Sequence, residues 1–137
     1  MNPDVLLDRI ATTLRRDVGP AVEGEYPRTQ AFMAAVVLEK LARQVALAAD
    51  HQQADREDRR ALAQDLAGLL DRADTPATLH EVVEAAGPEP SDAELCRLVE
   101  ALYRHRSELG ADRFDTVLGR VRRTLRAQVD RRLAVAS

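Results

Sequence analysis

The side chains in this sequence that are able to do chemistry are three histidines, one cysteine and a number of carboxylates. His51, His80 and His105 fall on three separate segments, and Cys96 has no second cysteine to pair with. A metal site needs several such side chains that converge, and this spacing does not predict one. We interpret the histidines as surface or boundary residues and expect no bound metal.

Cys96 and the acidic pairs also have structural interpretations. Cys96 lies within the packing face that runs from Leu95 to Leu102, where a buried and inert thiol is the usual occupant. Carboxylates such as Asp55 and Asp58 lie on polar stretches, where they are solvated. The six glycines are scattered, so no glycine-rich phosphate loop is present. We expect no catalytic residue and no cofactor, and predict that the chain is not an enzyme.

Arginines near the end of the sequence form its strongest charge feature. Arg122, Arg123 and Arg126 are our candidate contacts to phosphate groups or to a partner protein. A solvated helix face, or salt bridges to a partner, is the favoured interpretation of this cluster. The net charge of −3 argues against a general nucleic-acid binder.

Length and composition predict the architecture that must position these residues. A chain of 137 residues fits a single domain spanning 1–137, and 45% hydrophobic residues suffice for one core. With two Phe, two Tyr and no Trp, that core must consist of Leu, Val and Ala, which favours helices. The single cysteine and the lack of a signal or membrane-spanning pattern favour a cytoplasmic protein. We predict an all-α, single-domain helical bundle of about six helices, the second and last of them long.

Caps and hydrophobic spacing predict where these helices lie. Ser91 with Glu94 and Thr78 with Glu81 have the spacing of capping boxes. The expected segments are a helix from Pro3 to near Gly19, a helix from Pro27 to about Asp50, a solvated link over Asp50–Asp58, a helix containing Leu62–Leu70, a helix from Pro76 to Gly87, a helix from Ser91 to Gly110 and a helix over Asp112–Ala134.

The start of the second helix is the most informative segment, because Ala31–Leu38 is apolar on every side. Either it is the central helix of the bundle, or another chain buries one side of it. Around the loop that precedes this helix, aromatic rings occur together with an arginine, a combination that suits an interface anchor. The alternative, of equal weight, is that the rings only close the end of the core. The candidate interface residues are Tyr26, Arg28, Phe32, Met33, Val36 and Val37.

Two stretches of the sequence resemble a family of small bacterial helical proteins of unassigned function. They are Leu6–Val22 leading into Arg28–Val36, and the ending Leu125–Ala136. Members of that family are encoded beside aminoglycoside-phosphotransferase-like kinases and acyl-CoA dehydrogenases. The resemblance implies a small accessory subunit of a hydroxyacyl-CoA kinase. It carries over no catalytic residue.

We therefore predict a non-catalytic interaction subunit that packs against and supports a kinase-like partner protein. A homodimeric helical protein that binds a small acyl ligand between its helices is the alternative. A nucleic-acid-binding regulator that uses the arginine-rich last helix is a third and weaker hypothesis.

Overall fold

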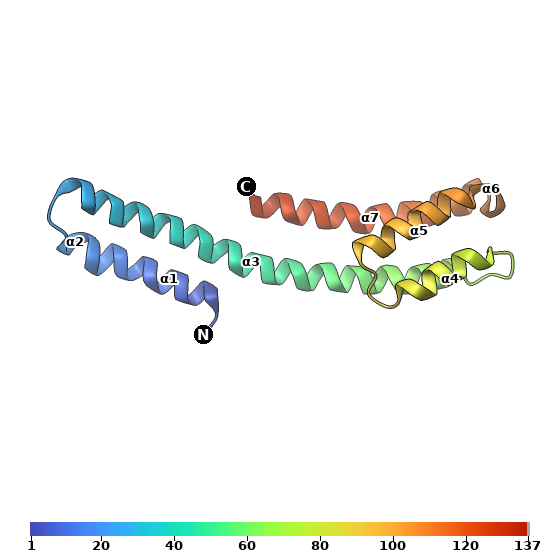
Figure 1. Cartoon of the computed structure of the whole chain (residues 1–137), viewed down its shortest axis with the longest axis horizontal. Helices are drawn as coiled ribbons and strands as arrows, with labels where there is room; N and C mark the ends of the chain where they lie inside the picture. Colours follow the sequence, from blue (N-terminus) through green and yellow to red (C-terminus); the bar gives the residue numbers. More distant parts are fainter. Residues whose placement is uncertain (137) are drawn as a thin grey trace. The chain divides into compact units, whose positions relative to one another are not determined.

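The computed structural model describes residues 1–136, with side chains up to residue 134, and all regular structure among them is helical (Figure 1). The all-α prediction is confirmed. In chain order the elements are α1 (Pro3–Thr13), the π-helical turn η1 (Leu14–Val18), α2 (Gly19–Ala21), α3 (Glu25–Leu70), α4 (Ala77–Ala86), α5 (Asp92–Arg104), α6 (Arg106–Leu109) and α7 (Ala111–Ala136).

Helix α3 is a single helix of 46 residues where the sequence predicts two helices and a link. The prediction of a solvated link over Asp50–Asp58 is wrong, because this whole segment is helical. A distant ion pair supports the helix here: Nη2 of Arg131 in α7 lies 2.7 Å from Oδ1 of Asp55 and 2.5 Å from Oδ2 of Asp58. These two carboxylates therefore bind a partner on α7 and are not simply solvated.

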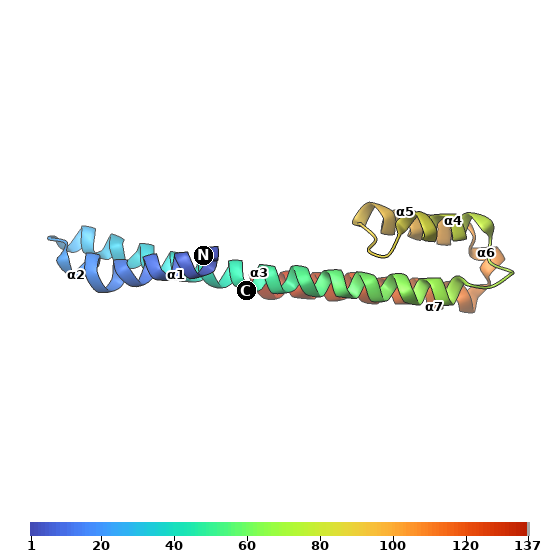
Figure 2. The same cartoon turned by 90° about the horizontal axis from the view of Figure 1, so that it is seen from below.

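The chain divides into two compact units, which we describe separately. The first, Met1–His51, we call the hairpin: α1, η1 and α2 lie beside the first half of α3 and run antiparallel to it (Figures 1 and 2). Gly24, with φ of 97°, makes the turn between them, a backbone conformation that side-chain-bearing residues rarely adopt. The second unit, from Gln52 onwards, we call the bundle; it contains the second half of α3 and helices α4 to α7.

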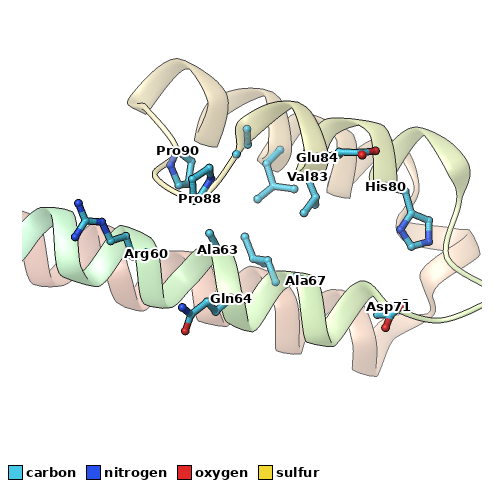
Figure 3. A pocket seen from close by; sticks show the side chains of 14 residues that line it. Arg60, Ala63, Gln64, Ala67, Asp71, His80, Val83, Glu84, Pro88 and Pro90 are labelled. Atoms are coloured by element: carbon cyan, nitrogen blue, oxygen red, sulfur yellow. The ribbon is translucent and has the colours of Figure 1, made fainter.

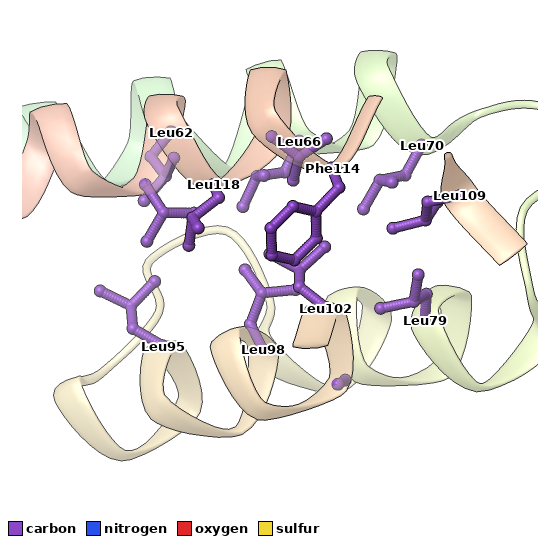
Figure 4. Close-up of a cluster of buried hydrophobic side chains, with 13 residues drawn as sticks. Leu62, Leu66, Leu70, Leu79, Leu95, Leu98, Leu102, Leu109, Phe114 and Leu118 are labelled. Atoms are coloured by element: carbon purple, nitrogen blue, oxygen red, sulfur yellow. The ribbon is translucent and has the colours of Figure 1, made fainter. Parts of the chain in front are cut away.

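The bundle contains the hydrophobic core of the described residues. The second half of α3 lies beside α7, and α4 and α5 cover the side of that pair from which the apolar residues project (Figures 2 and 4). Residues of all four helices, with Leu109 of the short α6, meet between these two layers. The core consists of Leu62, Leu66, Leu70, Leu79, Leu95, Leu98, Ala101, Leu102, Leu109, Phe114, Val117, Leu118 and Val121.

Local signals set the helix ends of the bundle. The capping box predicted at Ser91 is present: the Glu94 backbone N–H donates to the Ser91 hydroxyl, and the Ser91 backbone N–H donates to the Glu94 carboxylate. The box predicted at Thr78 is absent, because α4 begins at Ala77 and Thr78 already lies inside its first turn. The helix predicted to run to Gly110 is interrupted at His105, which separates α5 from α6.

Candidate functional site

The predicted interface residues all lie in the first turns of α3, and all are exposed. Tyr26 is 75% exposed, Met33 57% and Val37 54%, although most apolar side chains of this size are buried in folded proteins. Within the hairpin, Ala31–Leu38 is therefore not a central helix surrounded by its own neighbours. Arg28 is held at the loop, where its Nη2 donates to the carbonyl oxygen of Val22 at 3.4 Å.

The two arms of the hairpin meet through small residues. Ala11, Ala35, Ala42 and Gly19 are its buried residues, so no large side chain is fully buried between the arms. A Cβ atom at Gly19 would lie 3.1 Å from Cζ of Phe32, closer than ordinary van der Waals contact, so glycine permits this close approach. A small-residue contact brings the helices together and leaves their larger apolar side chains outside it.

One side of the hairpin is charged. A shallow depression between α1 and α3 is lined by acidic and basic side chains from both arms, among them Asp4, Asp8, Glu39 and Arg43. At the same side, Nη1 of Arg15 lies 2.7 Å from Oε1 of Glu39 and joins the arms by an ion pair. These groups are well solvated and need no further partner.

The opposite side of the hairpin is apolar. Because each residue of an α-helix is rotated by about 100° from the one before it, side chains two positions apart project to roughly opposite sides of the helix. Leu7, Leu14 and Leu38 are partly buried along the contact between the arms. Further out on this side, which we call the uncharged face, lie the exposed residues Leu6 and Ile10 of α1 and Val37, Leu41 and Val45 of α3.

The predicted interface set therefore divides between two sides of α3. Val37 belongs to the uncharged face, whereas Phe32 and Val36 lie towards the charged side, and Met33 lies at the outer edge. Sequence reasoning missed the contribution of α1, because the spacing of Leu6 and Ile10 also fits a helix with a buried stripe. No local signal separates the two cases, because it is the alanines Ala35 and Ala42 at the contact on the other arm that leave this stripe uncovered.

The bundle contains a second candidate site, a groove between α3 and α4 with a volume of about 660 Å³. Figure 3 shows Ala63 and Ala67 of α3 facing Val83 of α4 across it, so its centre is apolar. Arg60 lies towards one end and His80 towards the other. A groove of this size falls within the range of small-molecule sites. Hydrophobic spacing does not predict this groove, because its residues come from three helices and two loops.

Three of the seven arginines of α7 bind carboxylates within the bundle. Nε of Arg120 lies 2.6 Å from Oδ2 of Asp65, and Nη1 of Arg113 lies 3.2 Å from Oδ1 of Asp74. Arg120 and Arg131 thus hold α7 against α3, whereas Arg113 binds the loop that follows α3. The hydrogen bonds that Arg131 donates to the carboxylates of Asp58 and Asp55 raise its pKa above its already high ordinary value, so this guanidinium stays charged.

The candidate phosphate contacts Arg122, Arg123 and Arg126 are all exposed. Arg122 donates from Nη2 to the hydroxyl of Tyr103 at 3.4 Å. These three residues lie on a different side of α7 from the ion-paired arginines. The cationic surface is thus much smaller than the number of arginines in the sequence suggests, which weakens the nucleic-acid hypothesis.

The prediction that Cys96 is a buried core residue is wrong, because its side chain is exposed. The core face of α5 consists of Leu95, Leu98 and Leu102, and Cys96 lies about 100° around the helix from Leu95. Among residues 1–136 the structure shows no group of three or more His, Cys, Asp or Glu side chains able to hold a metal ion. No described helix has the length and apolar character needed to cross a membrane.

Comparison of the chain with protein families, with curated proteins and with solved structures finds no match.

Proposed function

We propose that this chain is a non-catalytic accessory subunit that binds a partner protein through its hairpin. The observation that carries the proposal is that the hairpin exposes most of its large apolar side chains while burying only alanine and glycine between its arms. An exposed apolar surface of this kind is typical of a protein interaction site.

The resemblance to proteins encoded beside aminoglycoside-phosphotransferase-like kinases supplies the identity of the partner. In this proposal a cytoplasmic kinase that acts on hydroxyacyl-CoA buries the loop end of the hairpin, around Tyr26, Phe32 and Val36. The accessory chain stabilises the kinase by binding its folded state, since any ligand that binds only the folded state increases its stability. The aromatic rings and Arg28 at the loop have the character of binding hot spots.

The test is co-expression of this chain with any kinase-like protein encoded beside it, followed by size-exclusion chromatography with light scattering. We expect a stoichiometric complex. The variant Val36→Lys should weaken that complex at least tenfold, because it places a charge in an apolar contact. Val129→Lys is the matched control, because Val129 of α7 is 51% exposed and Val36 is 49% exposed. The proposal fails if the chains elute separately, or if both variants bind like the wild type.

The groove between α3 and α4 favours a second candidate function, the binding of a small acyl ligand. Its apolar centre suits an acyl chain, and Arg60 at one end suits an anionic group, although Arg60 already pairs with Glu89 at 3.2 Å. The melting temperature of the chain should then rise with added acyl-CoA, and Ala63→Leu, which fills the groove, should abolish that rise. An unchanged melting temperature of the wild-type chain at saturating acyl-CoA would exclude this function.

A further inference from the structure

We propose that a second copy of this chain covers the uncharged face, so that two hairpins form an antiparallel four-helix bundle. The inference rests on the proposed function in one respect: both treat the hairpin as an interaction surface. It assigns the uncharged face to a second copy, and it leaves the loop end of the hairpin, with Phe32 and Val36, to a different partner.

The composition of the uncharged face is that of an interface centre. Along α3, the positions at helical spacing on this side carry no charged residue over five turns, whereas Glu39, Lys40 and Arg43 lie on the other sides of the same helix. Depletion of charge is what distinguishes the centre of an interface from the rest of a protein surface. The residues of this stripe are Gln30, Met33, Ala34, Val37, Leu38, Leu41, Gln44, Val45 and Ala48.

Helix α1 continues the same face. Leu6 and Ile10 are exposed beside the partly buried Leu7 and Leu14, and Thr13 adds an uncharged polar side chain. Asp17 lies at the far end, within the π-helical turn η1, where a carboxylate remains at the edge of the face. The face is therefore two helices wide, with an apolar centre on both helices.

The spacing on α3 matches the packing of helices in bundles. Ala34, Leu41 and Ala48 are seven residues apart, and Val37 and Gln44 repeat at the same interval between them. Alternating steps of three and four residues keep one stripe facing a nearly parallel or antiparallel neighbour. A face two helices wide needs a cover two helices wide, and a second hairpin supplies one of the same length through a two-fold axis.

The area of the face is sufficient for a dimer. Leu6 is 48% exposed, Ile10 41%, Val37 54%, Leu41 42% and Val45 37%. A large side chain at this exposure offers about 80 Å². With Met33, the alanines and the partly buried leucines, one face supplies roughly 600–700 Å², so two faces bury about 1,200–1,400 Å², which reaches the range of stable protein interfaces.

The experiment is sedimentation equilibrium on the full-length chain alone, over concentrations from micromolar to near millimolar. We expect a reversible monomer–dimer equilibrium in the wild type, and a monomer at every concentration for Leu41→Lys. The matched control is Val36→Lys, which lies on the same helix with similar exposure but on the other side, and should dimerise like the wild type. Leu41→Ala, which adds no charge, should weaken the dimer roughly tenfold.

Folding of the variants is checked by circular dichroism, because Leu41 lies outside the core of the bundle and its replacement should leave the helical content intact. A wild-type chain that stays monomeric at the highest concentration overturns the inference, as does an equal effect of Leu41→Lys and Val36→Lys on the dimer. Failure of the proposed function is distinguishable, since it appears as the absence of a kinase complex whether or not the chain dimerises.

Discussion

The hairpin and the bundle are built from the same kinds of residue, yet they differ in how much each buries. Thirteen apolar residues form the core of the bundle (Figure 4). Ten of them are leucine, valine or phenylalanine residues that are at most 3% exposed. The hairpin buries Ala11, Ala35, Ala42 and Gly19. Two layers of helices enclose apolar side chains between them, whereas two antiparallel helices have only one line of contact. The bundle supplies its own cover, whereas the hairpin leaves most of its large apolar side chains exposed.

The largest effect should come from the centre of the bundle. Leu102 is fully buried, so Leu102→Ala removes a side chain from the core and leaves a cavity. We expect a loss of about 3 kcal/mol in the free energy of unfolding, measured by urea denaturation. A loss below 1 kcal/mol would mean that the bundle core is loosely packed, and the contrast with the hairpin would disappear.

The ion pairs between α3 and α7 should contribute less than the core. Arg131→Ala leaves Asp55 and Asp58 without their partner, and we expect a loss of about 1 kcal/mol, because Asp58 is partly exposed and water screens its charge. Arg123→Ala on the exposed side of α7 is the matched control and should change the free energy of unfolding very little. Equal effects of the two substitutions would show that the pairing of Arg131 adds no stability.

These two sites also show what the sequence predicts well and what it does not. The core positions of α5 and of the first half of α7 follow from hydrophobic spacing. The same stripe of α7 predicts that Val129 and Leu133 are buried, which is wrong, because both are exposed. The helical state of Asp50–Asp58 does not follow, because it depends on Arg131, more than seventy positions further along the chain. The segment is polar, and the tertiary ion pair supports the helix together with the local hydrogen bond from Gln53 to Glu57.

The candidate site was predictable only in part, for a related reason. A helical segment that is apolar on every side, such as Ala31–Leu38, is expected to pack against other groups. Its sequence does not predict which of its sides packs against the rest of its own chain. That depends on the small contact residues Ala11 and Ala35, whose importance is visible only when the arms are paired. The groove between α3 and α4 was not predictable at all, since its walls come from separate segments.

The capping box of α5 offers a smaller test within the bundle. Ser91→Ala removes the hydroxyl that accepts a hydrogen bond from the Glu94 backbone N–H. We expect a loss of about 1 kcal/mol or less in the free energy of unfolding, the usual range for an N-cap. Ser91→Asp is the control: it restores an acceptor and should recover most of the stability in the same urea measurement.

Lowering the pH should destabilise the bundle at the N-terminal end of α5, where the capping box lies. Hydrogen bonding to Arg59 lowers the pKa of Asp92 below its ordinary value of 3.8, and hydrogen bonds from Ser91 lower the pKa of Glu94 below 4.5. Groups with a lowered folded-state pKa add stability above their unfolded pKa and lose it as the pH falls through the folded value.

The free energy of unfolding should therefore decrease as the pH is lowered from about 5 towards 3. Repeating the titration by thermal melts with Asp92→Asn should flatten part of this slope. An Asp92→Asn chain with the full wild-type slope would contradict the assignment to Asp92.

The smallest effect on folding should come from the hairpin, at Val36→Ala. Val36 keeps 49% of its surface exposed, so the substitution removes little buried area, and alanine favours the helix more than valine does. We expect the free energy of unfolding of the isolated chain to change by less than about 0.5 kcal/mol, while binding to the kinase-like partner weakens. If the isolated chain instead loses more than about 1 kcal/mol, Val36 is already buried without a partner. An exposed binding surface should contain side chains that contribute to binding and not to folding, and this substitution tests whether Val36 is one of them.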